Sequence, residues 1–310
     1  MATPPKVSVC MITYNHEKYI REAIEGVLMQ ECDFEVELIV ANDCSLDATD
    51  TIIEDILKNH PRASWIKYTY HNQNKGMMPN FIWALNQCKN KYIGLCEGDD
   101  YWTDSLKLQK QVDFLEGNKD CIICFTQSNV LLPNGKITVG SFYDKPLKTS
   151  FDDIIFENYI TTLTVVFLRP ANGFTIPDWY ANVPFGDWPL YMVLLKDGDY
   201  SYFLNNITAV YRKDVGISTN LRSVLSNLFL AEIKILKLIL NDRNFKNKEN
   251  VIKKSISLKF LSLMISFNRE YQYFKAIKVF ISLINKMNSK KLLKMYVHSI
   301  YVSIKKYRLK

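Results

Sequence analysis

Residues 97–102 read Glu-Gly-Asp-Asp-Tyr-Trp and place three carboxylates within four residues. They follow the apolar run Tyr-Ile-Gly-Leu-Cys of residues 92–96, which predicts a buried strand. Open α/β sheets bind their ligands at the C-terminal ends of the strands. Because adjacent carboxylates repel one another and hard divalent cations prefer oxygen ligands, the stretch indicates a metal–diphosphate site. A solvated acidic turn is the alternative for an Asp-Asp pair on its own.

The first hundred residues alternate between two apolar patterns. Continuous apolar runs predict buried strands at residues 7–13, 34–41, 65–70 and 92–96. Apolar residues at helical spacing predict helices at residues 20–30, 47–57 and 81–88, with Asp47 capping the second. Strands that alternate with helices predict an α/β protein with a doubly wound sheet flanked by helices.

Polar segments stand at the end of each predicted strand. They are Thr13-Tyr14-Asn15, Asn42-Asp43, residues 71–76 and the acidic stretch 97–100. In a doubly wound sheet these ends meet at one edge and form the binding crevice. The chain lacks both Gly-x-Gly-x-x-Gly after the first strand and Gly-x-x-x-x-Gly-Lys-Ser/Thr. A dinucleotide dehydrogenase and a P-loop NTPase are therefore disfavoured.

The pattern changes after residue 103. Strands are expected at residues 121–132 and 136–142, joined by the turn signal Pro-Asn-Gly, and a short helix at 151–158 precedes a strand at 161–168. The seven cysteines are odd in number and lie mostly in apolar runs, which is typical of reduced thiols in a cytosolic protein. Cys121-Ile-Ile-Cys124 has no second pair, so it is interpreted as core strand and not as a metal site.

Three segments together resemble a known enzyme family. Residues 7–15, 38–47 and 94–102 look like the signature segments of the family 2 inverting glycosyltransferases, which have the GT-A fold. The helical pattern at residues 105–115 is similar to that of bacterial members that build surface polysaccharide. The resemblance covers about residues 5–220. It implies a GT-A domain with a doubly wound mixed sheet flanked by helices, followed by a C-terminal helical region.

The resemblance also implies functional residues. The family's nucleotide-binding positions match Thr13, Tyr14, Asn15, Asp43, Lys75, Asn80 and Asp99. Among them, Asp43 matches the aspartate that accepts a hydrogen bond from the base, and Asn42 stands where members often carry another aspartate. Asp99 matches the residue that contacts ribose. Asp100, with Asp99 beside it, matches the position that holds Mn²⁺ or Mg²⁺ on the diphosphate.

Asp187 is the expected catalytic residue. It lies between Gly186 and Trp188, just before a helix predicted to start at Pro189. In the family an acidic residue here is the general base, which takes a proton from the acceptor hydroxyl as it attacks the anomeric carbon. The alternative is that Asp187 only caps the helix.

Residues 211–218 resemble the segment that closes the GT-A domain. Arg212 in this segment would pair with either the diphosphate or a structural carboxylate, and the sequence favours neither. Asp214 stands where many relatives carry a histidine, so it could ligate a metal but would repel a diphosphate.

The charge is divided unevenly along the chain. Residues 221–310 hold 20 Lys+Arg and 4 Asp+Glu, which leaves 19 basic and 28 acidic residues in 1–220. We therefore expect a catalytic domain at 1–220 and a basic helical region at 221–310. Apolar stripes on these helices fit either packing on the catalytic domain or contact with anionic lipid. No nucleic-acid-binding motif accompanies the charge, so nucleic acid is not an expected partner.

The sequence thus predicts a metal-dependent inverting glycosyltransferase with a nucleoside-diphosphate sugar as donor, a UDP-sugar being expected. The resemblance implies a hydroxyl acceptor on a lipid-linked glycan in surface polysaccharide synthesis. Without a signal peptide or an apolar run of about 18 residues, a cytoplasmic protein is expected, peripheral at the inner membrane. A sugar-phosphate nucleotidyltransferase and an inactive GT-A binding or scaffold subunit are the alternatives.

Overall fold

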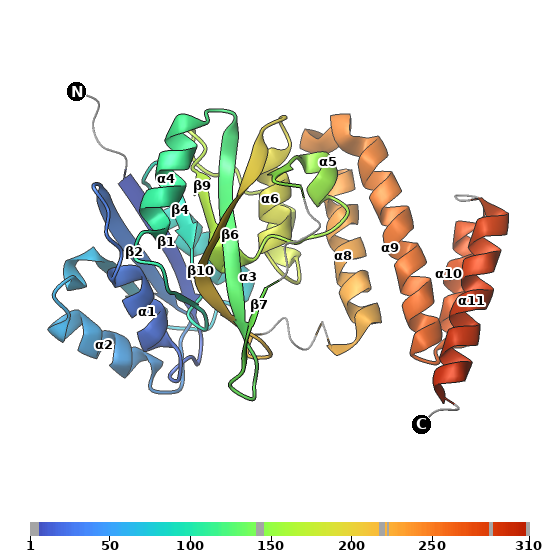
Figure 1. The fold of residues 1–310 in the computed structure, drawn as a ribbon, viewed down its shortest axis with the longest axis horizontal. Coiled ribbons are helices and arrows are strands. Elements are labelled where there is room, and N and C mark those ends of the chain that lie inside the picture. The colour runs from blue at the N-terminus through green and yellow to red at the C-terminus, as the bar shows by residue number, and fades with distance from the viewer. Residues whose placement is uncertain (1–5, 141–145, 217–220, 222, 285–287, 308–310) are drawn as a thin grey trace. The chain divides into compact units, whose positions relative to one another are not determined.

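The computed structural model describes residues 6–140, 146–216, 221, 223–284 and 288–307. The chain divides into two compact units, Met1–Gly216 and Ile217–Lys310. Figure 1 shows a sheet with surrounding helices in the first unit and helices alone in the second. The division expected at Asn220 falls outside the described residues.

One mixed sheet organises the first unit. Its strands follow the order β3-β2-β1-β4-β9-β6-β10-β5, with β7 beside β6 and β8 beside β10. The strands are β1 (Lys6–Thr13), β2 (Glu35–Asn42), β3 (Ile66–Tyr70), β4 (Tyr92–Leu95), β5 (Tyr101–Trp102), β6 (Cys121–Leu131), β7 (Ile137–Val139), β8 (Lys148–Thr149), β9 (Val165–Leu168) and β10 (Tyr200–Arg212). The helices are α1 (Ile20–Leu28), α2 (Thr49–Asn59), α3 (Met77–Gln87), α4 (Lys107–Gly117), α5 (Phe151–Ile154) and α6 (Asp187–Leu195).

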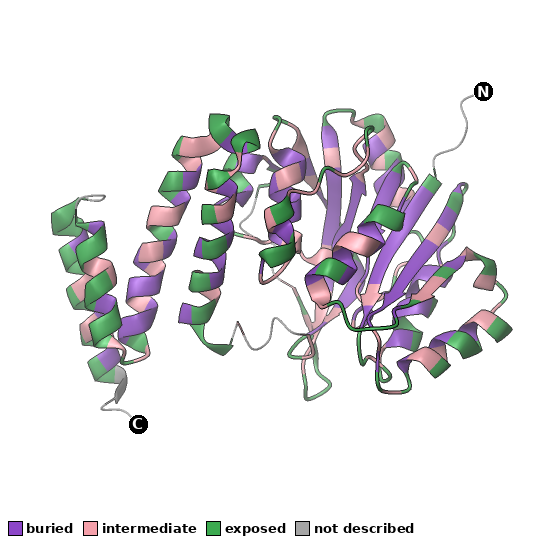
Figure 2. Ribbon diagram, turned by 180° about the vertical axis from the view of Figure 1, so that it is seen from behind, coloured by how far each residue is buried: buried purple, intermediate pink, exposed green. Residues whose placement is uncertain are grey.

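The N-terminal half of the sheet is parallel. β1 pairs with β2 and β4, and β2 pairs with β3, with Thr13 level with Asn42 at the strand ends. Crossovers between parallel strands are right-handed, and Figures 1 and 2 show α1 and α2 on one face of the sheet and α3 on the other. The predicted doubly wound α/β sheet is therefore confirmed. Its four strand ends meet at one edge.

The C-terminal half of the sheet is mixed. β9 runs antiparallel to β4 and β6, whereas β6 and β10 are parallel. The strand predicted from Thr161 begins only at Val165, because the N–H and hydroxyl of Thr164 both donate to the Thr161 carbonyl and form a turn. The sequence pattern predicts no strand over β10, because the alternation of apolar residues is broken there. In the structure this irregularity corresponds to three shifts in the register of β10 with β6.

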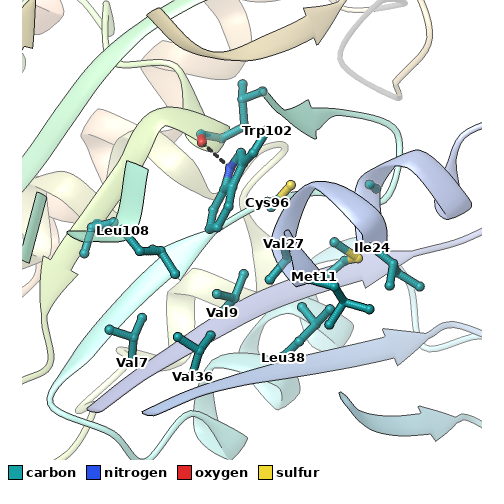
Figure 3. Packing of buried hydrophobic residues seen from close by; sticks show 14 of the residues in the cluster. Val7, Val9, Met11, Ile24, Val27, Val36, Leu38, Cys96, Trp102 and Leu108 are labelled. Carbon is teal, nitrogen blue, oxygen red and sulfur yellow. Dashed lines mark hydrogen bonds between the residues drawn. The ribbon is translucent and has the colours of Figure 1, made fainter. Parts of the chain in front are cut away.

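The apolar core beneath the carboxyl edge lies between the sheet and helices α1, α2 and α4. Figure 3 shows Val9 and Met11 of β1 facing Val27 of α1. Trp102 closes this core, and its indole N–H donates to the Leu163 carbonyl over 2.8 Å (Figure 3). Fully burying one such side chain contributes about 1.5–3 kcal/mol, so the core holds the strand ends firmly in place.

Cys121 and Cys124 are buried in β6, as expected for a core strand. Burial raises the pKa of both thiols to about 12, so neither is a reactive thiolate. All seven cysteines are free.

The second unit is helical. It contains α8 (Leu225–Asn241), α9 (Glu249–Arg269), α10 (Tyr273–Leu283) and α11 (Ser289–Tyr307). An apolar cluster formed by all four helices is their shared core, and Lys259 of α9 pairs with Glu232 of α8 at 2.8 Å. Among the residues that the structure describes, every helix is too short or too polar to cross a lipid bilayer.

Candidate active site

Three carboxylates gather in the turn that follows β4. The Asp100 N–H donates to the Glu97 carbonyl over 3.2 Å, which folds the turn back on itself. One oxygen from each of Glu97, Asp99 and Asp100 lies within 4.8 Å of the other two. Three carboxylate oxygens at this spacing suit a hard divalent cation such as Mn²⁺ or Mg²⁺.

Asp100 is the buried member of this acidic cluster. It is 2 % exposed, and burial raises its pKa well above the usual range, with the charge of Asp99 adding to the shift. Its Oδ1 accepts the backbone N–H of Arg212 at 2.7 Å. A buried carboxylate beside a second one is costly without a counter-charge. The electrostatics of the cluster therefore fit a bound cation.

Arg212 supports the acidic cluster through contacts of its guanidinium. Its guanidinium donates to the Asp99 carbonyl at 2.6 Å and pairs with the Glu22 carboxylate. It also lies over the rings of Tyr101 and Tyr19, at 4.5 and 5.0 Å. Of the two roles that the sequence leaves open, the contacts support pairing with a structural carboxylate.

Gly98 brings the ends of β4 and β1 into contact. Its N–H donates to the Ile12 carbonyl over 3.0 Å. A Cβ at this position would lie 2.8 Å from both Cβ and Oγ1 of Thr13 and 3.0 Å from Nδ1 of His16. Only glycine fits such an approach without displacement, so Thr13 and the acidic cluster belong to one site.

His16 is a site residue that the sequence pattern did not single out. Its Nδ1 lies 3.2 Å from Thr13 Oγ1. Burial lowers the pKa of His16, while the charges of Asp99 and Asp47 act in the opposite direction. Its only sequence signal is its place three residues after the end of β1.

The loop after β1 is joined to the loop after β2. Asn15 is left-handed, with φ at 55°, a conformation that asparagine tolerates better than most residues. Its N–H donates to Ser45 Oγ at 2.9 Å, and its Oδ1 accepts the Leu46 N–H at 2.8 Å. The Asn15 amide thus fixes the loops, whereas Tyr14 is exposed beside it.

Asp43 fastens the loop that precedes α3. Its two oxygens accept the backbone N–H groups of Lys75 and Gly76, at 2.7 and 2.9 Å. A carboxylate has about four acceptor sites, so Asp43 can hold this loop and still accept a donor from a ligand. The side chain of Lys75 is exposed next to it.

Asn42 and Asn80 are buried in the framework beneath the site. Asn42 Nδ2 donates to the Tyr68 hydroxyl at 2.9 Å. Asn80 Nδ2 donates to the Ala41 carbonyl at 3.0 Å, and its Oδ1 lies 3.0 Å from His71 Nε2. Both amides thus hold the strand end and the loop.

Asp187 stands at the first position of α6, two residues before the predicted start at Pro189. Such a boundary difference is ordinary for helix ends. Asn158 Nδ2 donates to Asp187 Oδ2 at 2.7 Å. A Cβ on the preceding residue, Gly186, would lie 2.8 Å from Cε of Met78 in α3. This close packing places Asp187 near the loop that Asp43 fastens.

Tyr191 is a buried residue of α6. Burial raises its pKa well above the usual range, and the charges of Asp187 and Glu97 both add to the shift. Both carboxylates are therefore within electrostatic reach of one phenol, although they stand 90 residues apart in sequence. Tyr191 is the second residue of the region that the sequence pattern did not single out.

The segment after β10 reaches the acidic cluster through Gly216. A Cβ at Gly216 would lie 3.1 Å from Asp99 Oδ2. Asp214, two residues earlier, is exposed and left-handed, with φ at 65°. Residues 217 and 218 of the predicted closing segment lie outside the described residues.

The contacts thus gather most of the predicted site residues along one edge, while Asn80 lies beneath it. Those gathered are Thr13, Tyr14, Asn15, Asp43, Lys75, Asp99, Asp100 and Asp187. Asn158 has no sequence signal, because its contact with the site is a hydrogen bond to Asp187, 29 residues away.

Comparisons with known proteins show the family to which the chain belongs. The family model described as "Glycosyl transferase family 2" matches residues 8–165. An uncharacterised protein of Mycobacterium tuberculosis, Rv1520, is 36 % identical over 211 residues, which are 67 % of this chain and 58 % of that relative. TuaG of Bacillus subtilis, whose name assigns it to teichuronic acid biosynthesis, is 29 % identical over 209 residues, covering 67 % of this chain and 79 % of TuaG.

Two solved structures share the fold. S. aureus TarS 1–349 in complex with UDP-GlcNAc has a TM-score of 0.60 at 17 % identity, covering 98 % of this chain and 92 % of that one. The mannosyltransferase PcManGT from Pyrobaculum calidifontis, in complex with GDP-Man and Mn²⁺, has a TM-score of 0.63 at 14 % identity, covering 99 % and 83 %. With the family match over half of its length, this chain is a member of glycosyl transferase family 2 and has the GT-A fold.

Proposed function

We propose that this glycosyltransferase moves a sugar from a nucleoside-diphosphate sugar to a hydroxyl acceptor with inversion at the anomeric carbon. The observation that carries the proposal is the acidic cluster of Glu97, Asp99 and Asp100, together with Asp187 at the first position of α6, where it accepts a hydrogen bond from Asn158. The acidic cluster suits a diphosphate–metal complex, and Asp187 suits an acceptor hydroxyl.

The reaction needs two kinds of help. A divalent cation on the acidic cluster would neutralise the charge that develops on the departing diphosphate. Asp187 takes the proton from the acceptor hydroxyl as its oxygen bonds to the anomeric carbon and the bond to the diphosphate breaks. Asn158 holds the Asp187 carboxylate at 2.7 Å during this step. The products are the glycosylated acceptor and the nucleoside diphosphate.

The donor would lie along the strand ends. Asp99 would contact ribose, and Asp43, already fastened to the loop at Lys75, would accept a hydrogen bond from the base. Thr13 and Tyr14 would flank the nucleotide. Relatives of this fold have been solved with UDP-GlcNAc and with GDP-Man and Mn²⁺, which supports a sugar nucleotide and a metal. A UDP-sugar is the donor we test first.

A lipid-linked glycan in surface polysaccharide synthesis is the proposed acceptor. The name of TuaG supports a polysaccharide pathway. An acceptor carried on lipid would require the enzyme to work at the cytoplasmic face of the membrane. The basic second unit supports such a peripheral location.

The two alternatives have less support. Family membership disfavours a nucleotidyltransferase. Asn42 and Asp214 are the residues that favour an inactive subunit. The Asn42 amide is bonded to Tyr68 within the framework, Asp214 is exposed, and the acidic cluster and Asp187 are both present.

Donor turnover tests the proposal. The protein is incubated with a panel of sugar nucleotides and Mn²⁺, and release of nucleoside diphosphate is measured with water or a lipid-linked glycan extract as acceptor. Asp187→Asn should bind the donor normally and turn over about 10²–10⁴-fold more slowly. Asp178→Asn, at an exposed aspartate nearby, is the matched control and should leave the rate unchanged.

Two results would contradict the assignment. Normal turnover by Asp187→Asn at saturating donor would remove its role as base. Release of pyrophosphate from a nucleoside triphosphate and a sugar phosphate would point to the nucleotidyltransferase.

A further inference from the structure

Helices α10 and α11 expose apolar residues in regular rows. Phe274, Ile277 and Ile281 recur at helical spacing on α10, and Leu293, Val297 and Tyr301 do so on α11. These six side chains are 42–72 % exposed, and we refer to them as the outer rows. Scattered exposed apolar residues are normal, but regular rows on two neighbouring helices mark a contact surface.

The outer rows are not the face on which these helices pack. Ala276, Leu283 and Leu292 turn inward to the apolar cluster of the second unit. The Tyr273 hydroxyl lies 2.8 Å from Ser303 Oγ, and the rings of Phe280 and Tyr296 lie 4.7 Å apart. The first pair joins the start of α10 to the end of α11, and the second joins the last turn of α10 to the first half of α11, so the two helices form an antiparallel hairpin. The inner side of the hairpin is the side that packs on the apolar cluster.

The charge around the outer rows has one sign. No acidic residue follows Glu270, whereas residues 271–310 contain 10 Lys+Arg. Lys278, Lys290 and Lys294 are exposed, and each lies three residues before a member of the outer rows. Residues three apart are neighbours on a helix surface. The apolar rows are therefore bordered by cations.

We propose that the α10–α11 hairpin lies on an anionic lipid surface, with the outer rows in the boundary between headgroups and acyl chains. Lysines beside the rows would reach the phosphates while their aliphatic stems remain on the apolar side. A second copy of the chain fits poorly here, because it would bring the same positive charge to the contact. The outer rows of the hairpin are thus the face through which the protein would contact the membrane.

The proposed lipid-binding surface of the α10–α11 hairpin rests on the proposed function only for its biological purpose, which is to bring the enzyme to a lipid-linked acceptor. Binding to vesicles needs neither donor nor acceptor, so failure of one proposal leaves the other standing. In particular, Asp187→Asn should bind vesicles as the unmodified protein does.

Vesicle co-sedimentation tests the surface with the full-length protein. The unmodified protein should pellet with vesicles of phosphatidylcholine and phosphatidylglycerol at low salt, and remain in the supernatant with phosphatidylcholine alone. The combined variant Phe274→Ser, Val297→Ser, Tyr301→Ser should lose at least tenfold in partitioning. Its changes are at exposed positions, and circular dichroism checks that it is folded.

A matched variant controls for lost apolar surface in general. Ile137→Ser, Val139→Ser and Leu147→Ser alter side chains of the first unit that are 53, 53 and 54 % exposed. This control should partition like the unmodified protein. Equal loss in both variants would show that the outer rows have no special part and would overturn the proposal.

The charge is tested separately. Lys278→Gln, Lys290→Gln and Lys294→Gln together should weaken binding by about a hundredfold at low salt, since each basic residue near an anionic surface adds to the attraction. The control replaces three exposed lysines of the first unit, Lys58, Lys89 and Lys136.

Three further outcomes would overturn the proposal. They are equal recovery with anionic and neutral vesicles, binding that depends on the lysines but not on the outer rows, and a concentration-dependent dimer that the Ser variant abolishes.

Discussion

The proposed catalytic geometry depends on one hydrogen bond between Asn158 and Asp187. Asn158 follows α5, and its amide reaches a carboxylate at the start of α6. In the proposed mechanism this bond holds the orientation of the Asp187 carboxylate toward the acceptor. A hydrogen bond to a charged group contributes about 1.5–3 kcal/mol, which corresponds to roughly 10–100-fold in rate if it acts in the transition state.

We therefore expect Asn158→Ala to lower kcat about 10–100-fold and to leave the donor KM and the unfolding midpoint nearly unchanged. Asn158→Gln, which retains the donor, should recover part of the rate. Asn182→Ala, at an exposed asparagine close in sequence, is the control. A parallel loss of stability and donor affinity would instead make Asn158 a structural residue.

Lys107 is a buried lysine, and burial disfavours its charged form. It is fully buried, with hydrogen bonds to Gln111 and to the Thr164 carbonyl, and lies 4.7 Å from the centre of the Trp102 ring. Burial lowers its pKa from 10.5 to about 7. Between these values the unfolded chain binds a proton that the folded protein does not. The free energy of unfolding therefore rises with pH in this window, by at most about 1.4 kcal/mol per pH unit.

Lys107→Met should remove that contribution. The unfolding free energy of the unmodified protein minus that of the variant should rise by about 2 kcal/mol between about pH 7 and about pH 9, as measured by urea denaturation. Lys89→Met, at an exposed lysine, should show no such trend. A difference that is flat with pH would mean that Lys107 keeps its proton in the folded state.

At the residue scale, the groups at strand ends can be predicted from the sequence, whereas pairs of residues far apart in the chain cannot. Thr13, Asp43 and Asp99 could be predicted to meet because the carboxyl ends of parallel strands share one edge. The pair of Arg212 with Glu22 joins residues 190 positions apart, and no local pattern encodes it. Such pairings depend on the finished topology.

At the scale of elements, the parallel β-α units followed their patterns and the later strands did not. β1 and β4 are continuous apolar runs, each buried by helices, so their sequence decides their structure. β10 combines buried residues with three register shifts, and β9 starts after a turn made by Thr164. Irregular pairing of this kind is decided by neighbouring strands and leaves no clear period.

Helix α1 and strand β5 approach so closely that a glycine is required between them. A Cβ on Gly26 would lie 2.8 Å from the backbone N of Trp102 and 2.9 Å from its carbonyl oxygen. Alanine would normally stabilise a helix interior by about 0.5–1 kcal/mol relative to glycine. Overpacking against backbone costs about 1–3 kcal/mol, and this larger effect should prevail.

Gly26→Ala is therefore expected to lower the unfolding free energy by about 1–2 kcal/mol, measured by urea denaturation. Gly117→Ala is the matched control, because Gly117 ends α4 with nothing within 4 Å of the added carbon. It should be neutral or slightly stabilising. A stabilised Gly26→Ala protein would show that α1 can shift away from β5 at little cost.

At the scale of the whole molecule, charge and fold divide the chain in similar places. The sheet-containing unit ends at Gly216, and the acidic excess of residues 1–220 gives way to the basic excess of residues 221–310. Net charge of opposite sign suits opposite partners, a metal and an anionic surface. Charge repulsion within the acidic cluster also lowers the stability of the folded protein, because the charge of Asp99 adds to the raised pKa of Asp100.

This conflict leads to an expectation for the stability of the protein. A ligand that binds only the folded state raises the unfolding free energy by about 2.7 kcal/mol at a hundredfold excess over its Kd. We expect UDP with Mn²⁺ to raise Tm more than UDP alone does. Asp99→Asn should lose the Mn²⁺-dependent part of this rise, and its unliganded Tm should be equal or higher because one repelling charge is gone.

A thermal-shift series over nucleoside diphosphates, with and without Mn²⁺, makes both measurements and identifies the preferred base. Asp120→Asn, at an exposed aspartate away from the cluster, should respond to ligands like the unmodified protein. If Asp99→Asn had a lower unliganded Tm and kept its full response to Mn²⁺, Asp99 would be a structural carboxylate. If neither protein responded to Mn²⁺ with any nucleotide, the acidic cluster would not be a metal site. The expected result is that Asp99→Asn has a higher Tm without ligand and no longer responds to Mn²⁺. This result would mean that charge repulsion in the acidic cluster destabilises the unliganded protein and that a bound cation relieves it.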